Sequence, residues 1–219
     1  MLPQNSNKHV AESARYALLR RLAPSLRHDM AGALQPLMFV SAILEKRLQN
    51  PNPDVADLAR KSSELTTLAR LASSTCMNLL AWLEPNKDEL VTVSAGVEEV
   101  MGLVRTELSF KGITIVNETG DVHAELLRSQ TRNVLTAAML TLTDAATAPG
   151  KLVLAAQLVE REIMLTILFQ RAESEMPTSG IGCYRNLDWA DLQVLAEVES
   201  VRVTYTADRV NLYLTLIET

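Results

Sequence analysis

The stretch that decides the fold is Leu26-Arg27-His28-Asp29-Met30, which lies inside a long pattern of helical period. Apolar residues recur around it at alternating steps of three and four: Leu19, Leu22, Leu26, Met30, Ala33, Leu37, Val40 and Leu44. This spacing is typical of the a and d positions of a helix that packs against other helices. At about 100° per residue, His28 projects roughly 200° from Leu26, nearly opposite the apolar stripe. We therefore expect His28 to face solvent beside the Asp29 carboxylate, where it is placed for chemistry rather than packing.

The sequence on both sides of this stretch predicts a helical hairpin. One helix covers about 11–48, with Pro24 and Pro36 inside it, and the turn-forming run 49–54 ends it. A second apolar series predicts a helix that ends at 84–88: Val55, Leu58, Ser62, Leu65, Ala69, Ala72, Cys76, Leu79 and Leu83. We divide the chain into a flexible N-terminus (1–10), the hairpin (11–84), a linker (85–89) and a C-terminal domain (90–219).

Two helices of this length cannot bury both apolar stripes by themselves, because each stripe needs neighbours on more than one side. Two copies that form an antiparallel four-helix bundle would meet that need, so we expect a homodimer through the hairpin. The alternative is that the C-terminal domain folds back and covers the hairpin within one chain.

The C-terminal domain is predicted to be an α/β sandwich with a largely antiparallel sheet. Strands are expected at 90–93, 113–116, 151–159, 162–169, 201–207 and 210–217, with a tight turn at 160–161. Helices are expected at 94–108, with Ser94 as N-cap, at 126–146 and at 191–199. The segment 171–186, which contains Pro177, Gly180 and Gly182, is predicted to be a loop.

Composition narrows the class of protein. The 219 residues carry a net charge of −5, which gives no reason to expect binding to nucleic acid. The two cysteines, Cys76 and Cys183, have no metal-ligand or redox spacing and are expected to be reduced thiols. No apolar run approaches the ~20 residues that span a bilayer, and the first residues lack the apolar core of a signal peptide. We therefore expect a cytoplasmic protein that does not associate with a membrane.

The order of a hairpin carrying His-Asp, a linker and an α/β sandwich resembles the catalytic core of sensor histidine kinases. The strongest local match is His28 to Leu37, which is similar to the H-box variant H-D-F-N-N-L-L-x-P. The resemblance implies that His28 is phosphorylated and that Asp29 orients or deprotonates it. It also implies a dimerisation and phosphotransfer hairpin, followed by a domain of the ATP-binding type. Gly32 replaces the polar residue that the family uses in dephosphorylating its partner.

The nucleotide-binding motifs of that family are missing. Its metal-binding helix reads N-x-x-x-N-A-x-D-A, and an alignment on Asp144-Ala145 puts Ala137 and Thr141 at the two asparagine positions. Alanine cannot coordinate Mg²⁺, and threonine is a poor replacement for an amide. Gln170–Ser174 stands where the adenine-binding D-x-G-x-G is expected, and Gly180-Ile181-Gly182 is only a fragment of a glycine-rich lid.

Taken together, the resemblance favours a degenerate kinase that works as a histidine phosphotransferase. Such a protein is a phosphotransfer intermediate in a phosphorelay, carrying phosphate on His28 between receiver-domain aspartates without ATP-dependent autokinase activity. No cofactor of its own is expected, because the partner receiver domain would supply Mg²⁺. The expected partners are response-regulator receiver domains, with a hybrid histidine kinase as a further candidate.

Receiver docking is expected on Arg27, Leu34 and Met38, on the same stretch of helix as His28. Arg20, Arg21 and Arg27 suggest a basic patch that would attract an acidic receiver surface, although a solvated helix face explains them almost as well. Two other functions stay open: a divergent but active sensor kinase, and a non-catalytic dimeric scaffold of a two-component system.

Overall fold

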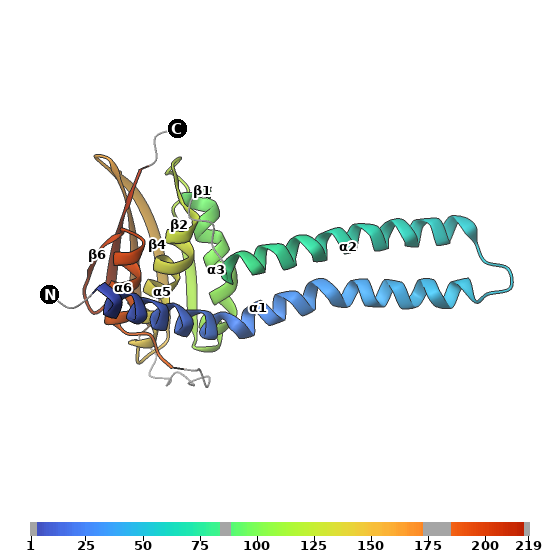
Figure 1. The fold of residues 1–219 in the computed structure, drawn as a ribbon, viewed down its shortest axis with the longest axis horizontal. Helices are drawn as coiled ribbons and strands as arrows, with labels where there is room; N and C mark the ends of the chain where they lie inside the picture. The colour runs from blue at the N-terminus through green and yellow to red at the C-terminus, as the bar shows by residue number, and fades with distance from the viewer. Residues whose placement is uncertain (1–3, 84–88, 173–184, 217–219) are drawn as a thin grey trace. The chain divides into compact units, whose positions relative to one another are not determined.

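The computed structural model describes residues 4–83, 89–172 and 185–216, with side chains from residue 8 onward. The chain divides into two compact units (Figure 1). The hairpin unit is Ala23–Glu84, and the α/β unit combines Met1–Leu22 with Pro85–Thr219. The first helix, α1 (Gln4–Leu48), contributes residues to both units.

The hairpin unit contains the rest of α1 and helix α2 (Val55–Leu83). Asp54 caps α2, since its Oδ1 accepts hydrogen bonds from the backbone N–H groups of Ala56 and Asp57. The core of this unit is thin: among its described residues, Val40, Ala72 and Trp82 are the ones that are buried.

The two predicted apolar stripes of the hairpin differ in how far their residues are buried. On α1 the predicted positions Leu26, Ala33, Leu37, Val40 and Leu44 are shielded at least in part, whereas the predicted position Met30 is exposed. On α2, four predicted positions are exposed: Val55, Ser62, Ala69 and Leu83. Leu68 and Trp82, which directly precede two of them, are shielded instead. A straight helix has 3.6 residues per turn, so a seven-residue pattern drifts by about 20° per heptad and leaves the inward face.

The first turns of α1 pack with the α/β unit, and we call residues 4–22 the α1 arm. Small or apolar side chains of the arm are buried: Ala11, Ala14, Ala17, Leu18 and Leu22. The expected flexible segment 1–10 is therefore helical from Gln4, and the hairpin unit begins at Ala23 rather than at residue 11. Within one chain, the C-terminal domain therefore covers the part of the predicted hairpin that belongs to the arm, residues 11–22. The alanines of the arm let the helix approach the domain closely.

The α/β unit is built on a five-stranded sheet of order β2-β4-β5-β7-β6. Strands β2 and β4 are parallel, and the remaining neighbours are antiparallel. The strands are β2 (Ile113–Glu118), β4 (Gly150–Val159), β5 (Glu162–Arg171), β6 (Arg202–Tyr205) and β7 (Arg209–Thr215). A separate two-stranded sheet pairs β1 (Leu90–Thr92) with β3 (Glu125–Leu127). The predicted hairpins β4–β5 and β6–β7 are confirmed.

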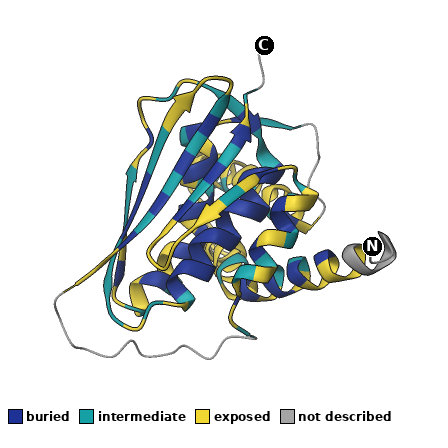
Figure 2. Ribbon diagram, turned by 90° about the vertical axis from the view of Figure 1, so that its left-hand side faces the viewer, coloured by how far each residue is buried: buried dark blue, intermediate teal, exposed yellow. Residues whose placement is uncertain are grey.

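Side chains alternate along the central strands, so one face of the sheet forms the core. Ile163, Leu165 and Ile167 of β5 are buried, and so are Leu212 and Leu214 of β7. Helices α3 (Val93–Phe110), α5 (Thr136–Asp144) and α6 (Trp189–Val198) are packed with the sheet, and their inner faces are buried as well (Figure 2). The predicted fold class, a helical N-terminal region followed by an α/β sheet domain, is confirmed.

Two predicted helices begin differently in the structure. The cap of α3 is Thr92, whose Oγ1 accepts from the N–H of Ala95, and not Ser94, which already lies inside the helix. The predicted helix 126–146 starts with strand β3 and becomes helical at α4 (Arg128–Gln130), because β3 pairs with β1. A π-helical turn, η1 (Thr131–Leu135), separates α4 from α5.

Helix α6 ends in a Schellman motif that has serine where glycine is favoured. The N–H of Val201 donates to the carbonyl of Ala196, and that of Ser200 donates to Glu197, while Ser200 has a φ of 56°. An L-residue in this left-handed conformation is strained, and glycine is not.

We expect Ser200→Gly to raise the free energy of unfolding by about 0.5–1 kcal/mol, because the strain exceeds the entropy cost of glycine. A higher urea midpoint for the glycine variant would verify this. Ser200→Ala keeps the Cβ and is the matched control; an equal gain from alanine would rule out the backbone explanation.

Candidate functional site

His28 lies on α1 in the hairpin unit with its ring open to solvent. Its side chain is 81% exposed, and Nδ1 lies 3.3 Å from Oδ1 of Asp29. The apolar residues of the hairpin interior, such as Leu26 and Leu37, lie on other faces of the helix and are partly shielded. The ring is therefore exposed, as the helical period predicts, and one of its nitrogens has a carboxylate partner.

The residues predicted to dock a receiver domain are also exposed. Leu34 and Met38 are 38% and 69% exposed, and Arg27 is exposed too. Met30, Leu34 and Met38 follow one another at steps of four, so they form an exposed apolar stripe on α1 that begins two residues after His28. A stripe of this kind is suited to contact with another protein.

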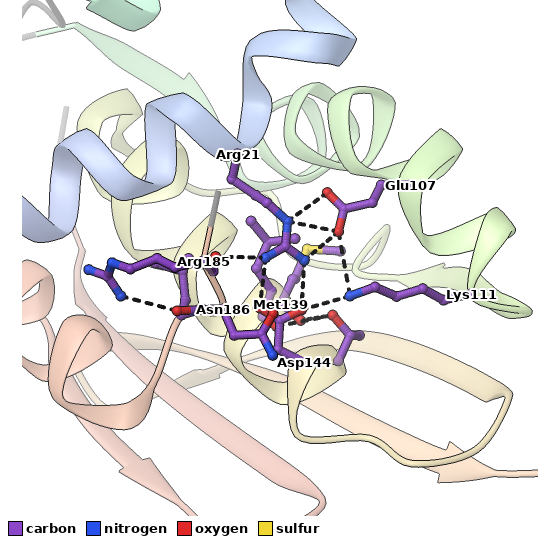
Figure 3. A network of polar contacts seen from close by, with 10 residues as sticks. Arg21, Glu107, Lys111, Met139, Asp144, Arg185 and Asn186 are labelled. Atoms are coloured by element: carbon purple, nitrogen blue, oxygen red, sulfur yellow. Dashed lines mark hydrogen bonds and ion pairs between the residues drawn. The ribbon is translucent and has the colours of Figure 1, made fainter. Parts of the chain in front are cut away.

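The basic patch suggested by Arg20, Arg21 and Arg27 does not form, because Arg21 is buried in the α/β unit (Figure 3). Its guanidinium donates to both carboxylate oxygens of Asp144, at 2.6 and 2.9 Å, and to Glu107 of α3 at 2.5–3.1 Å. It also donates to the carbonyl of Arg185 at 3.2 Å. Lys111 completes this Arg21 cluster with an Nζ–Oδ1 distance of 2.6 Å to Asp144.

Two cations and two carboxylates balance in the Arg21 cluster, with side-chain exposures of 3% for Arg21 and 2% for Asp144. Burial alone would raise the pKa of Asp144, but hydrogen bonds from Arg21 and Lys111 outweigh it and hold that pKa below its ordinary value. Burial would likewise lower the pKa of Arg21, and its hydrogen bonds with Asp144 and Glu107 raise it instead. Both residues therefore stay ionised near neutral pH.

The residues at the expected nucleotide positions do not fit a Mg²⁺–nucleotide complex. Ala137 and Thr141 are buried at 0% and 2% exposure, and the Thr141 hydroxyl lies 3.4 Å from the carbonyl of Asp188. Both carboxylate oxygens of Asp144 already accept hydrogen bonds, one of them also from the N–H of Leu187. Gln170 and Arg171 end strand β5, while 173–184, including the Gly180–Gly182 fragment, lie outside the described residues.

Sequence reasoning missed the Arg21 cluster, although a signal for it exists. Arg21 lies three residues after Leu18 and four after Ala17, so helical spacing puts it on the buried face of the arm. A charge at such a position needs an opposite charge in the fold.

No protein-family model and no curated protein matches this chain. Solved structures that are similar in fold include the histidine kinase AdeS of Acinetobacter baumannii, at 17% identity and a TM-score of 0.45, covering 84% of this chain and 98% of that one. A bacterial phosphotransferase shares 14% identity, with a TM-score of 0.42 and 98% of both chains covered. The catalytic domain of histidine kinase ThkA shares 14% identity, with a TM-score of 0.43, over 58% of this chain and 94% of that one. These likenesses concern the fold alone.

None of the helices in the described ranges is both long enough and apolar enough to cross a membrane. Within the same ranges, no three side chains among His, Cys, Asp and Glu gather closely enough to hold a metal ion.

Proposed function

We propose that this chain is a dimeric histidine phosphotransfer protein, in which His28 accepts a phosphoryl group from one receiver-domain aspartate and passes it to another. The observation that carries the proposal is the exposed His28 ring with a carboxylate at Nδ1. The resemblance of His28–Leu37 to an H-box supports it, as do the expected nucleotide positions that do not fit a nucleotide. The same proposal places the chain in the cytoplasm, where a reduced thiol such as that of Cys76 persists.

The His28–Asp29 geometry selects the reacting nitrogen. When Nδ1 carries the proton and donates a hydrogen bond to Asp29, the free lone pair of the neutral imidazole is on Nε2. Nε2 forms a bond to phosphorus while the bond from phosphorus to the aspartyl oxygen breaks, and the receiver aspartate leaves as a carboxylate. Asp29 stabilises the positive charge that develops on the ring. The Mg²⁺ that neutralises the phosphoryl oxygens would come from the receiver domain, and positioning accounts for most of the rate.

The hairpin unit has exposed apolar surface that dimerisation would cover. Exposed apolar residues outside the docking stripe occur along both of its helices: Phe39, Leu48, Val55, Leu71, Met77, Leu80 and Leu83. With three buried side chains among its described residues, this unit gains from a second copy that completes a four-helix bundle. Light scattering should then give twice the 24.1 kDa of one chain.

Labelling from a phosphorylated receiver and labelling from ATP together distinguish a phosphotransfer protein from an active kinase. Incubation with a ³²P-phosphorylated receiver domain should label the wild-type chain. Labelled ATP with Mg²⁺ should give no label and no heat of nucleotide binding, because Ala137 offers no metal ligand and the buried Thr141 hydroxyl is a poor one. No label from any receiver tested would refute the transfer function, and label from ATP would establish the divergent kinase instead.

Leu34→Asp should slow phosphotransfer about tenfold while leaving the dimer intact. The reason is that a charge replaces an apolar contact in the exposed stripe of Met30, Leu34 and Met38, which begins two residues after His28 in the sequence. The rate of label transfer from a receiver and the mass by light scattering are measured together.

Leu158→Asp is the matched control, since Leu158 is also an exposed leucine but lies on β4 of the α/β unit, outside the hairpin. The docking surface would be wrong if Leu34→Asp transferred at the wild-type rate, or if both variants lost the same activity.

A further inference from the structure

A groove between the α1 arm and α6 forms a second candidate site inside the α/β unit. Its volume is about 390 Å³, within the range of small-molecule pockets. Ala11 and Arg15 contribute to the wall on the arm, and Val194, Leu195 and Val198 line the opposite side on α6. The groove thus combines an apolar surface with a few charged groups, which is the usual make-up of a ligand site.

Arg15, which lines the groove, has an unmet hydrogen-bond donor. Its Nη2 is buried, and no acceptor for it exists among the described residues. A buried donor without a partner costs about 1–3 kcal/mol, and more when it is charged. A carboxylate or other oxygen acceptor in the groove would remove that cost.

Glu199, which lines the groove, accepts hydrogen bonds from two other side chains. Glu199 accepts from Ser129 Oγ and from Asn133 Nδ2, both at 2.6 Å. Asn133 is buried and comes from the π-helical turn η1, a type of turn that is frequent at functional sites. Each oxygen of Glu199 thus accepts one of these hydrogen bonds, and neither accepts from Arg15 Nη2.

Charge along the groove decides which ligand fits. Lys8 and Arg15 contribute two positive charges, and Glu12, Glu197 and Glu199 contribute three negative charges. This balance disfavours a doubly charged anion such as phosphate and suits a molecule that carries both signs.

We propose that the groove binds a small zwitterion with an apolar side chain, of the amino acid class. Its carboxylate would accept from the guanidinium group of Arg15, and its ammonium group would face Glu12 and Glu197. Its side chain would lie on Val194, Leu195 and Val198. One wall of the groove belongs to the arm and the other to α6. A bound ligand would therefore stabilise the state in which the arm is packed against the α/β unit, by mass action. This proposal goes beyond phosphotransfer and does not depend on it.

Calorimetry of the full chain with four related probes tests the proposal. L-leucine should bind with a dissociation constant of roughly 0.1–1 mM, as expected for a ligand of this size. Glycine lacks the side chain, 4-methylpentanoate lacks the ammonium group, and 3-methylbutylamine lacks the carboxylate. Each should bind at least about tenfold more weakly. Equal affinity for all four probes, or no binding of L-leucine up to about 20 mM, overturns the proposal.

Variants locate the binding in the groove. Arg15→Met keeps the apolar stem and removes the donor, so it should weaken L-leucine at least about tenfold. Arg105→Met removes an exposed arginine of α3 outside the groove and should bind like wild type. Val198 is 57% exposed, so Val198→Asp leaves no buried cavity, and it should also weaken binding. Wild-type affinity in both Arg15→Met and Val198→Asp would place the ligand elsewhere and refute the site.

Discussion

His28→Ala is expected to abolish labelling by a phosphorylated receiver domain, by at least about 100-fold, because the substitution removes the nucleophile itself. Label on the protein after a short incubation, resolved by gel and autoradiography, measures the effect. The phosphoryl bond to nitrogen is a further readout, since phosphohistidine is lost in acid and persists in alkali, unlike a phosphate ester.

His9→Ala is the matched control for this experiment. His9 lies on the same helix, is 78% exposed and has a carboxylate neighbour, with Nδ1 3.6 Å from Glu12. It lacks the H-box context, so His9→Ala should transfer at the wild-type rate. Transfer by His28→Ala at a normal rate would remove the proposed function and leave the scaffold interpretation in its place.

Much of the fold could be predicted because local patterns determine it. The period of two alternating strands predicts β4 and β5, and their two-residue turn leaves one register. Asp54 after a run of prolines and asparagines predicts the start of α2. The exposed face of His28 also follows from helical period alone, since it needs only the direction of the neighbouring apolar residues.

The boundary between the two units could not be predicted in the same way. Helix α1 continues across it, and the apolar period runs unbroken from Leu19 to Leu44, so nothing local marks the place where the packing partner changes. Pro24, just past the boundary, looks the same in sequence as Pro36, which lies well inside the hairpin unit. The partner of Arg21 is equally hidden, because Asp144 is 123 residues away.

Arg21→Met is expected to destabilise the packing of the α1 arm by about 3 kcal/mol. Breaking a buried ion pair from one side leaves the other charge without compensation, here Asp144 and Glu107 with only Lys111 between them. Hydrogen–deuterium exchange of peptides within 8–22 should then speed up about 100-fold. Arg20→Met changes the exposed neighbouring arginine and is the control.

A double variant separates charge imbalance from lost packing. Arg21→Met with Asp144→Asn removes one charge of each sign, keeps an acceptor for the N–H of Leu187, and leaves Lys111 with Glu107. The double variant should therefore be more stable than Arg21→Met alone. If it is less stable, the role of Arg21 is packing of its side chain and not neutralisation of Asp144.

The same cluster predicts how stability depends on pH. The pKa of Asp144 is lower in the folded chain than in the unfolded chain, so its contribution is complete above the ordinary carboxyl value of about 4. As the pH falls below that value, the unfolded chain takes up the proton first, and the contribution disappears on passing the depressed folded pKa. Wild-type arm protection should therefore decline below about pH 4, and Arg21→Met should show a shallower decline because its Asp144 has lost the main source of the shift. Parallel pH profiles for the two proteins would show that Asp144 does not depend on Arg21.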